Sequence, residues 1–443
     1  MDRVVHRSLA FLGLAAVLVA SSPAIAHEDH LGTWDPSPES RTQNVKIIGS
    51  APKTSTVPSY RNSDLAFWGR DVYAGNYEGF RIIDASAPAE PKVISDYQCA
   101  GSQHDVSVWK GLMFLSVDTP LTSPACGSPR SLDAEGHTAP GFEGIRIFDV
   151  SDPASPSYVG AVATDCGSHT HTLVPDKDDP SRMLIYVSSY PSSELAESPY
   201  GNSCSQSGEG HSKISVVEVP LGNPAASSVV SEPRFELNDL RGTPGFRGCH
   251  DISVFSEIDR AAAACMSEGQ IWDISDPEHP TTTARIHNPH FDFFHSATFT
   301  WDGSTVLFGD EAGGGTSPRC RTTDPDTVGA IWMYDVSSLD TMDSTTEEQS
   351  LSHFKIPRVQ GDKARCTMHN FNVLPIEGRY VGVSAAYSGG TTVFDFTERT
   401  DPVEVGHNDP HGANTWSSYW YNGYVYSNDT GRGVDVMLLS DED

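Results

Sequence analysis

The chain contains 443 residues, of which 59 are acidic and 29 are basic, so its formal net charge is −30. This excess of acid excludes a protein that holds nucleic acid through phosphate contacts, and it argues against docking on an anionic membrane surface. Hydrophobic residues make up 37 % of the chain, which is enough for a packed core. At roughly 150 residues per domain the length suggests about three domains, although propellers exceed that prior.

The N-terminus has the features of a Sec-type signal peptide. Two arginines within the first seven residues precede an apolar run over residues 9–20, and Ala24–Ala26 has the small-x-small form of a cleavage site. We therefore expect residues 1–26 to be removed, leaving a secreted chain whose residues 27–43 form a flexible N-terminal segment. The apolar run is too short to span a membrane, and no later stretch is apolar enough, so we expect no membrane insertion.

One sequence phrase recurs along the chain. Residues 79–88 read GFRIIDASAP, residues 144–153 read GIRIFDVSDP and residues 269–277 read GQIWDISDP. Four weaker copies, the first of them with Glu218 in place of Asp, lie at residues 213–220, 331–337, 392–397 and 434–439. Seven copies at a spacing of roughly 40–50 residues are typical of propeller blades.

Each copy of the phrase has the same neighbours. Two short β-rich runs precede it and another follows it, as in residues 105–109, 112–116 and 158–162 around the second copy. Four strands per repeat predict an all-β, seven-bladed β-propeller with four-stranded blades over residues 44–443. The last repeat lacks a fourth strand, whereas the strand at residues 44–49 has no partner before it. Pairing the two would close the ring and remove both sheet edges.

The repeats resemble the LVIVD-repeat family of secreted bacterial β-propellers. The phrase at residues 79–88 and its copy at residues 144–153 carry the resemblance, which extends over residues 44–439. The resemblance implies the propeller fold and a secreted bacterial protein. It does not define an activity, because propellers host many functions.

Histidines recur at one position of the repeat. When the first strand of each blade is aligned on the turn that follows it, five of the seven blades carry histidine at the strand entrance. These residues are His104, His171, His250, His295 and His369. The first strand of a blade lines the central channel, so equivalent residues on successive blades form a ring. Imidazole is the commonest protein ligand of transition metals, and the pattern predicts a metal site with His169 as an auxiliary ligand.

Acidic residues end the second strands, which return to the same face of the propeller. Metal-bound histidines usually donate their other N–H to a carboxylate or carbonyl, so these residues are candidates for that supporting role. They are Glu78, Asp118, Glu268, Asp310, Glu311 and Asp429. Asp105 and Asp251 each follow a ring histidine and point the other way in a regular strand, which predicts contacts between blades.

A structural role for the histidines is the alternative. In WD-type propellers a histidine before the innermost strand forms hydrogen bonds within its own blade and binds no ligand. Two observations favour the metal site. Ser63 and Trp416 stand at the aligned position in blades 1 and 7, so the fold does not demand histidine there, and acidic residues gather at the same rim.

The eight cysteines are even in number, and in an exported chain they favour disulfides over thiolate metal ligation. Most of them either precede a ring histidine by a few residues or lie in a long insertion between second and third strands. Sequential pairing is the simplest arrangement, with bonds Cys99–Cys126, Cys166–Cys204, Cys249–Cys265 and Cys320–Cys366.

These patterns define two classes of function. The first is a secreted propeller whose histidine ring holds copper, iron, zinc or manganese, either as a binding site or as a metal-dependent oxidoreductase. The second is a non-catalytic extracellular interaction or scaffold propeller with structural histidines. The expected partner is a small molecule or an extracellular protein, and the scaffold alternative would bind a protein or glycan through its face loops; no nucleic acid is expected in either case. We expect a monomer, and the sequence identifies no catalytic residue.

Overall fold

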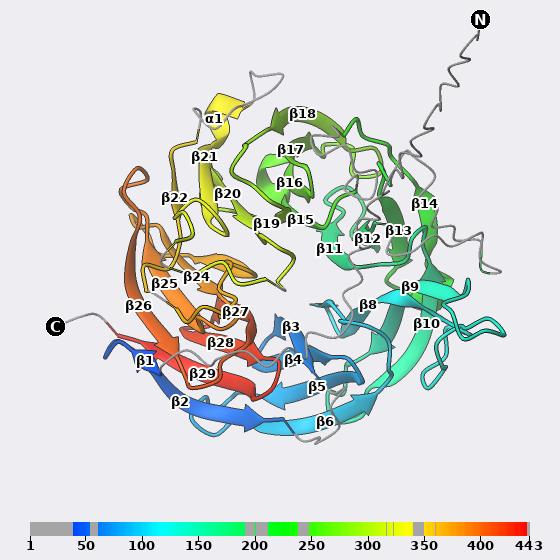
Figure 1. Cartoon of the computed structure of the whole chain (residues 1–443). Coiled ribbons are helices and arrows are strands. Elements are labelled where there is room, and N and C mark those ends of the chain that lie inside the picture. The colour runs from blue at the N-terminus through cyan, green and yellow to red at the C-terminus, as the bar shows by residue number, and fades with distance from the viewer. Residues whose placement is uncertain are drawn as a thin grey trace, which may run out of the picture.

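The computed structural model is a ring of seven antiparallel β-sheets around a central axis (Figure 1). It describes residues 39–53, 61–190, 200, 211–237, 248–315, 317–321, 323–339, 350–358 and 360–440. The predicted seven-bladed, all-β propeller is confirmed. The predicted signal peptide and most of the segment predicted to be flexible lie outside the described residues.

Each blade has its first strand nearest the axis and its last strand at the outer edge. From the axis outward, blade 1 contains β3 (Asn62–Trp68), β4 (Asp71–Asn76), β5 (Gly79–Asp84) and β6 (Lys92–Gln98). Blade 2 contains β7 (Val106–Trp109), β8 (Leu112–Leu121), β9 (Phe142–Asp149) and β10 (Ser157–Ala163). Blade 3 contains β11 (Thr170–Pro175), β12 (Arg182–Ser188), β13 (Ser215–Pro220) and β14 (Ser228–Ser231). Blade 4 contains β15 (Asp251–Phe255), β16 (Arg260–Cys265), β17 (Glu268–Asp273) and β18 (Thr281–Ile286). Blade 5 contains β19 (Phe294–Phe299), β20 (Thr305–Asp310), β21 (Ile331–Asp335) and β22 (Ser352–Phe354). Blade 6 contains β23 (Phe371–Leu374), β24 (Val381–Ala385), β25 (Thr391–Asp395) and β26 (Val403–Asp409). Blade 7 contains β27 (Thr415–Tyr421), β28 (Tyr424–Asp429), β29 (Gly433–Leu439) and β2 (Val45–Pro52). Helix in the described residues is confined to α1 (Val336–Leu339) and the 3-10 turns η1 (Pro224–Ala226) and η3 (Ser256–Ile258).

The aspartate of the repeat phrase ends the third strand and closes a turn. The backbone N–H of Ser86 donates to Asp84 Oδ1 at 2.8 Å, and that of Ser151 donates to Asp149 Oδ1 at 2.9 Å. The same bond recurs in three further blades, at Asp273, Asp335 and Asp395. Asp favours such turns because its short side chain reaches the backbone two residues on. Glu218, the exception in blade 3, pairs with the Arg182 side chain instead.

The glycine and arginine of the phrase also have structural roles. Gly79 has φ of 146°, and a Cβ there would lie 2.0 Å from the Tyr97 carbonyl oxygen of the neighbouring strand, so only glycine fits. Arg81 is fully buried and donates to the Pro52 carbonyl of β2 at 2.7 Å. The recurring phrase is therefore a folding signal in blade 1 and not part of a site.

The ring is closed by strands from opposite ends of the chain, as predicted. Strand β2 pairs antiparallel with β29, from Val45 opposite Leu439 to Pro52 opposite Gly433. A short strand, β1 (Ser40–Arg41), adds to the outer edge of blade 6 by pairing with β26. Figure 1 shows β1 and β2 (dark blue) beside β26 and β29 (orange and red). Two residues of the segment predicted to be flexible thus form a strand.

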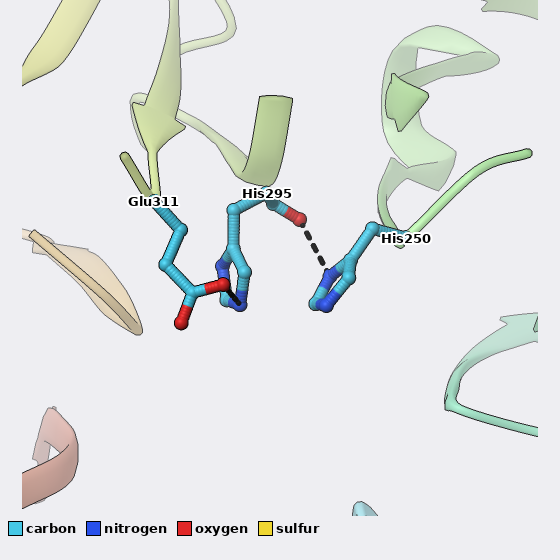
Figure 2. Close-up of side chains that lie close together, drawn as sticks. All are labelled: His250, His295 and Glu311. Carbon is cyan, nitrogen blue, oxygen red and sulfur yellow. Dashed lines mark hydrogen bonds and ion pairs between the residues drawn. The ribbon is translucent and has the colours of Figure 1, made fainter. Parts of the chain in front are cut away.

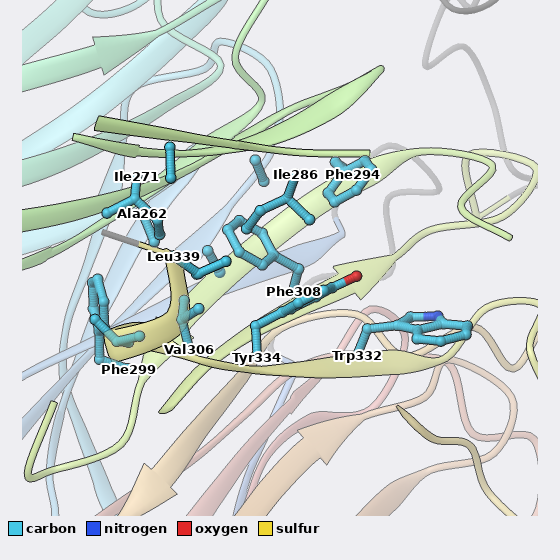
Figure 3. Close-up of a cluster of buried hydrophobic side chains, with 14 of the residues drawn as sticks. Ala262, Ile271, Ile286, Phe294, Phe299, Val306, Phe308, Trp332, Tyr334 and Leu339 are labelled. Atoms are coloured by element: carbon cyan, nitrogen blue, oxygen red, sulfur yellow. The ribbon is translucent and has the colours of Figure 1, made fainter. Parts of the chain in front are cut away.

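Apolar layers between adjacent blades form the core. Between blades 4 and 5, Ile271 and Ala262 lie in one cluster with Phe294, Phe308 and Tyr334 (Figure 3). Similar clusters fill the other spaces between blades. Such packing leaves the inner ends of the first strands facing the axis. Within the described residues, no helix has the length and apolar character needed to cross a membrane.

Three of the four predicted disulfides are present. They are Cys99–Cys126, Cys249–Cys265 and Cys320–Cys366. Cys166 is also disulfide-bonded, and its predicted partner Cys204 lies outside the described residues. Two of these bonds involve cysteines that lie shortly before His250 and His369 in the sequence, namely Cys249 and Cys366.

Candidate metal centre

Four histidines from successive blades lie side by side near the axis. His169, His250 and His369 precede the first strands of blades 3, 4 and 6, and His295 lies in β19 of blade 5. The centroids of successive imidazole rings are 4.4, 4.0 and 4.4 Å apart. All four residues are buried. We call this set the histidine arc.

Backbone hydrogen bonds hold three members of the arc in equivalent places. The N–H of His169, His250 and His369 each donates to a carbonyl in the second strand of its own blade, with distances of 2.8 to 2.9 Å. The repeat alignment assigns this place to His171 in blade 3. The bonding pattern assigns it to His169, which the sequence predicts only as an auxiliary ligand.

Hydrogen bonds to the next blade orient two of the rings. His250 Nδ1 donates to the backbone carbonyl of His295 at 3.0 Å, and His369 Nδ1 donates to that of Trp416 at 2.6 Å. A carbonyl only accepts hydrogen bonds, so Nδ1 carries the proton and Nε2 carries the lone pair. A second partner of this kind is what fixes the tautomer of a metal-binding histidine. Backbone carbonyls thus do here what the sequence assigns to carboxylates.

Glu311 follows β20 and faces the arc. Its Oε2 lies 3.7 Å from His295 Nε2, and its Oε1 lies 3.6 Å from His369 Nε2. The Tyr387 hydroxyl donates a short hydrogen bond to Oε1. In Figure 2 the side chains of Glu311, His295 and His250 project to the same side. Glu311, predicted as a supporting carboxylate, therefore lies close enough to the histidines to be a metal ligand together with them.

His250, His295 and Glu311 form a group that could hold a metal ion. One ligand atom of each residue lies within 4.8 Å of the other two. Metal bonds of about 2.0–2.1 Å bring tetrahedral ligands to about 3.4 Å of one another, so modest side-chain shifts suffice to bind an ion. Nitrogen and carboxylate donors without thiolate suit copper, iron, zinc and manganese.

The charge of Glu311 depends on an added cation. Burial raises the pKa of Glu311 to about 8, against the opposing effect of the hydrogen bond from Tyr387. Without an ion, the carboxyl therefore holds a proton at neutral pH. A metal cation would displace this proton and stabilise the ionised form, because metal binding and ligand deprotonation are coupled.

His104 bonds outside the arc. Its Nδ1 donates to the Asn76 carbonyl of blade 1 at 2.6 Å, and its backbone has φ of 60°. Burial lowers the pKa of His104 to about 4, so the ring is neutral at physiological pH. The contact joins blades 1 and 2, so it is not the within-blade bond of the structural alternative; like the Nδ1 bonds of His250 and His369, it goes to a backbone carbonyl of a neighbouring blade.

Both ring nitrogens of His171 contact hydroxyl groups of blade 2. Nε2 lies 2.6 Å from Ser107 Oγ and Nδ1 lies 2.8 Å from Ser116 Oγ. Asp105 Oδ2 accepts the backbone N–H of His171 at 2.7 Å, which is a contact between blades of the kind that the sequence predicts for Asp105. His171 therefore connects blades 2 and 3.

The remaining acidic candidates differ in their contacts. Asp118 Oδ2 lies 2.7 Å from His169 Nδ1, the arrangement expected of a supporting carboxylate. Glu268 forms an ion pair with Arg285 at 3.0 Å within its own blade. Glu78 is half-buried, and its backbone N–H donates to the Asn76 side chain. Of these three, Asp118 is the one with a side-chain contact to the arc, and its supporting role stays a prediction.

Asp310 and Asp429 bind backbone groups. Asp310 accepts the N–H groups of Asp292 and Phe293 at 2.9 Å and that of Gly329 at 2.8 Å. Asp429, at the same place in blade 7, accepts the N–H of Asn414 at 2.6 Å. Because Phe293 lies two residues before His295, Asp310 positions the arc through the backbone.

Aromatic side chains enclose the arc. Tyr190 stacks at 5.7 Å on His250, whereas Tyr387 and Trp416 lie 4.6 and 4.9 Å from His369. The sequence shows Trp416 at the aligned position but contains no signal for Tyr190 or Tyr387. Both tyrosines lie just past the ends of second strands, in loops that the repeat does not specify.

A small cavity lies among these side chains. It has a volume of about 30 Å³, and the four arc histidines, Glu311 and Trp416 line it. A space of roughly 10–15 Å³ holds one water, so this cavity fits about two small atoms or molecules beside the ligand atoms. The space beside the ligand atoms is thus of the size of an ion with one small ligand.

Fold and site together define a seven-bladed β-propeller with a histidine and carboxylate cluster at its axis. The LVIVD repeat model matches residues 141–164, so the chain contains an LVIVD repeat. A search of curated proteins finds no match.

Solved propellers share the fold at low sequence identity. The chain is similar to the β-propeller domain of Cps50 (Swd1) from Myceliophteria thermophila, with 10 % identity, a TM-score of 0.51, and coverage of 88 % of this chain and 100 % of that one. It is also similar to a proposed 6-phosphogluconolactonase from Bacteroides fragilis, with 10 % identity, a TM-score of 0.50, and coverage of 85 % and 89 %. At such identity the likeness shows the fold alone.

Proposed function

We propose that this protein is an exported bacterial propeller that binds one transition-metal ion through His250, His295 and Glu311, with His369 as a fourth donor. The buried group of two imidazoles and one carboxylate carries the proposal. Buried ionisable groups are costly unless they are paired or coordinate a metal. The carbonyl partners of His250 and His369 direct both Nε2 lone pairs, which supports this ligand set.

The proposed activity is that of a metal-dependent oxidoreductase. A hydrolase would have to bring an organic substrate to the ion, whereas the cavity beside the ligands measures only about 30 Å³. Electron transfer and reactions of small oxygen species need no more space than this. Copper, iron and manganese are the redox-active members of the ions that suit the donor set.

Export is part of the proposal. The three disulfides and the bonded Cys166 are typical of a chain that folds in an oxidising compartment, and residues 1–26 have the pattern of a signal peptide. The thiols are thus engaged in disulfides, which supports a donor set of nitrogen and oxygen.

Metal reconstitution of the purified chain tests the proposal. The protein is produced in an oxidising compartment, stripped with a chelator, dialysed against copper, iron, manganese or zinc, and analysed for metal content. We expect one ion per chain for at least one metal. Glu311→Gln removes the anionic ligand and is expected to abolish stoichiometric binding.

Glu143→Gln is the matched control. Glu143 is also buried, and burial raises its pKa to about 8, yet it lies in β9 and is not a member of the proposed ligand set. This variant should bind as much metal as the wild type. Wild-type protein that retains no ion, or a Glu311→Gln variant that binds as well as the control, would favour the scaffold alternative with structural histidines.

A further inference from the structure

The axial cavity has polar walls besides the proposed metal ligands. Asp64, Gln103, Asp105, Thr170 and Asn370 also line it. Thr170 and Asn370 are engaged with neighbouring blades, because Thr170 Oγ1 donates to the His250 carbonyl at 2.6 Å and Asn370 Nδ2 lies 3.3 Å from Ser417 Oγ. The cavity is therefore hydrophilic on the side that the histidine arc does not form.

Gln103 is the unexplained member of this wall. The residue is only 6 % exposed, and its amide nitrogen is buried with no hydrogen-bond partner in the described part of the chain. A buried amide without a partner costs free energy of the order of a lost hydrogen bond. Its place in the wall of a cavity next to the arc points to a ligand that supplies the partner.

Two carboxyl groups in the same wall can accept hydrogen bonds, whereas the Gln103 amide nitrogen donates them. Asp64 and Asp105 line the same cavity and share a hydrogen bond with each other. Each carboxyl oxygen accepts more than one hydrogen bond, so the pair can accept a further O–H. A ligand between Gln103 and these carboxyls must both accept and donate hydrogen bonds, which a hydroxylic oxygen does.

We infer that the cavity binds a hydroxylic ligand of one or two oxygen atoms, water or hydrogen peroxide, which completes the coordination of the metal ion and accepts a hydrogen bond from Gln103. The inference rests on the proposed metal site. The volume of about 30 Å³ is about that of two water-sized groups, which is the scale of an ion with one small oxygen ligand. Gln103 is thus a binding residue for the ligand and not for the metal.

Pulsed EPR of the copper(II)-loaded protein in ¹⁷O-enriched water tests this inference. We expect a coupling from one exchangeable oxygen, and hydrogen peroxide is then titrated in. Loss of the ¹⁷O coupling identifies peroxide as a ligand, whereas persistence at every peroxide concentration identifies water; both results support a hydroxylic ligand. tert-Butyl hydroperoxide, which exceeds the cavity, should not displace the coupling.

Substitution of Gln103 tests its role. Gln103→Leu should bind copper at the wild-type stoichiometry but weaken the ligand about 3- to 10-fold, the loss expected for one neutral hydrogen bond. If water is the ligand, the same change appears as a reduced ¹⁷O coupling. Gln98→Leu makes the same chemical change on the surface and should have no effect.

Three results would overturn the inference while leaving the metal site intact. They are a copper-loaded protein without ¹⁷O coupling, displacement by tert-butyl hydroperoxide at the same concentration as by hydrogen peroxide, and an unchanged ligand in Gln103→Leu. Failure to load copper or any other ion would instead refute the proposed function on which the inference rests.

Discussion

In each axial histidine, the hydrogen bond made by one ring nitrogen determines whether the other nitrogen carries a proton or a lone pair. His250 and His369 donate from Nδ1 to carbonyls of the next blade, which leaves Nε2 with the lone pair. His171 instead contacts serine hydroxyls through both nitrogens. We therefore expect substitutions of these histidines, which are equivalent in the sequence repeat, to differ in their effect on metal affinity.

Alanine substitutions test this expectation. His250→Ala and His295→Ala each remove a ligand and should weaken metal binding by at least about 100-fold, since loss of a supporting partner alone costs 10–100-fold. His104→Ala and His171→Ala should destabilise the fold yet retain one ion per chain. Isothermal titration with the preferred ion measures both. Loss of metal from His171→Ala at an unchanged melting temperature would contradict this ligand set.

Glu143 predicts a pH dependence of stability. Burial, reinforced by the charges of Asp118 and Asp165, raises its pKa to about 8. From about pH 4.5 to about pH 8 the folded protein holds a proton that the unfolded chain has lost, so the free energy of unfolding falls as pH rises. Glu143→Gln remains neutral and should lose less stability between about pH 5 and pH 9.

Thermal unfolding across this pH range is the measurement. The difference between wild type and Glu143→Gln should amount to a few degrees in melting temperature. Glu135→Gln, which changes an exposed glutamate, should follow the wild type. Parallel pH profiles for wild type and Glu143→Gln would show that Glu143 does not hold its proton.

The structure places His169, and not His171, beside His250, and the reason is local. Histidines 169 and 171 lie two apart, and alignment on the following turn favours the second. Cys166 and Gly167 have φ of 57° and 72°, so the chain before β11 is not extended and the register shifts. Tyr387 has φ of 42° in a loop after β24, where no repeat pattern predicts that its hydroxyl reaches Glu311.

At the scale of the strands and loops, disulfide bonds constrain the segments that contain the arc histidines. Cys249–Cys265 joins the entrance of β15 to the end of β16, directly before His250. The sequence is sufficient for this level of organisation. Strand alternation and the Asp turn predict the blades, and cysteine spacing predicts the three bonds that are present. The sequence could not predict the conformations of the loops near the axis, because their contacts do not follow the sequence repeat.

Removal of one disulfide should affect the metal site selectively. The double change Cys249→Ala and Cys265→Ala opens a short loop and should cost roughly 3 kcal/mol of stability. It should also weaken metal binding, because His250 loses its anchor. Cys99→Ala with Cys126→Ala is the matched control, destabilising without altering the metal affinity. Denaturant unfolding and metal titration compare the two, and equal metal affinities would argue against anchoring of His250 by the disulfide.

For the whole molecule, ring closure joins the N-terminal strand to the last blade. Val45 of β2 is fully buried in one cluster with Val383, Val425 and Met437 of blades 6 and 7. The proposed metal ligands come from adjacent blades, His250 from blade 4, His295 and Glu311 from blade 5 and His369 from blade 6. Their mutual distances therefore depend on the packing of these blades in the ring. The sequence predicts this closure from an incomplete last repeat and an unpaired first strand.

A charge in this cluster should open the ring. Val45→Asp buries an unpaired carboxylate and is expected to destabilise the fold by about 4 kcal/mol or more. Lys46→Asp changes the next residue of the same strand, which is exposed, and should remain within about 0.5 kcal/mol of the wild type. Urea unfolding followed by tryptophan fluorescence measures both. Similar midpoints for the two variants would contradict closure through β2.

Anomalous diffraction from crystals grown with the preferred ion tests the central claim most directly. We predict one axial peak per chain, at about 2.0–2.2 Å from His250 Nε2, His295 Nε2 and a Glu311 oxygen. No axial peak, or a peak bound only by surface residues, would contradict a metal centre in the propeller.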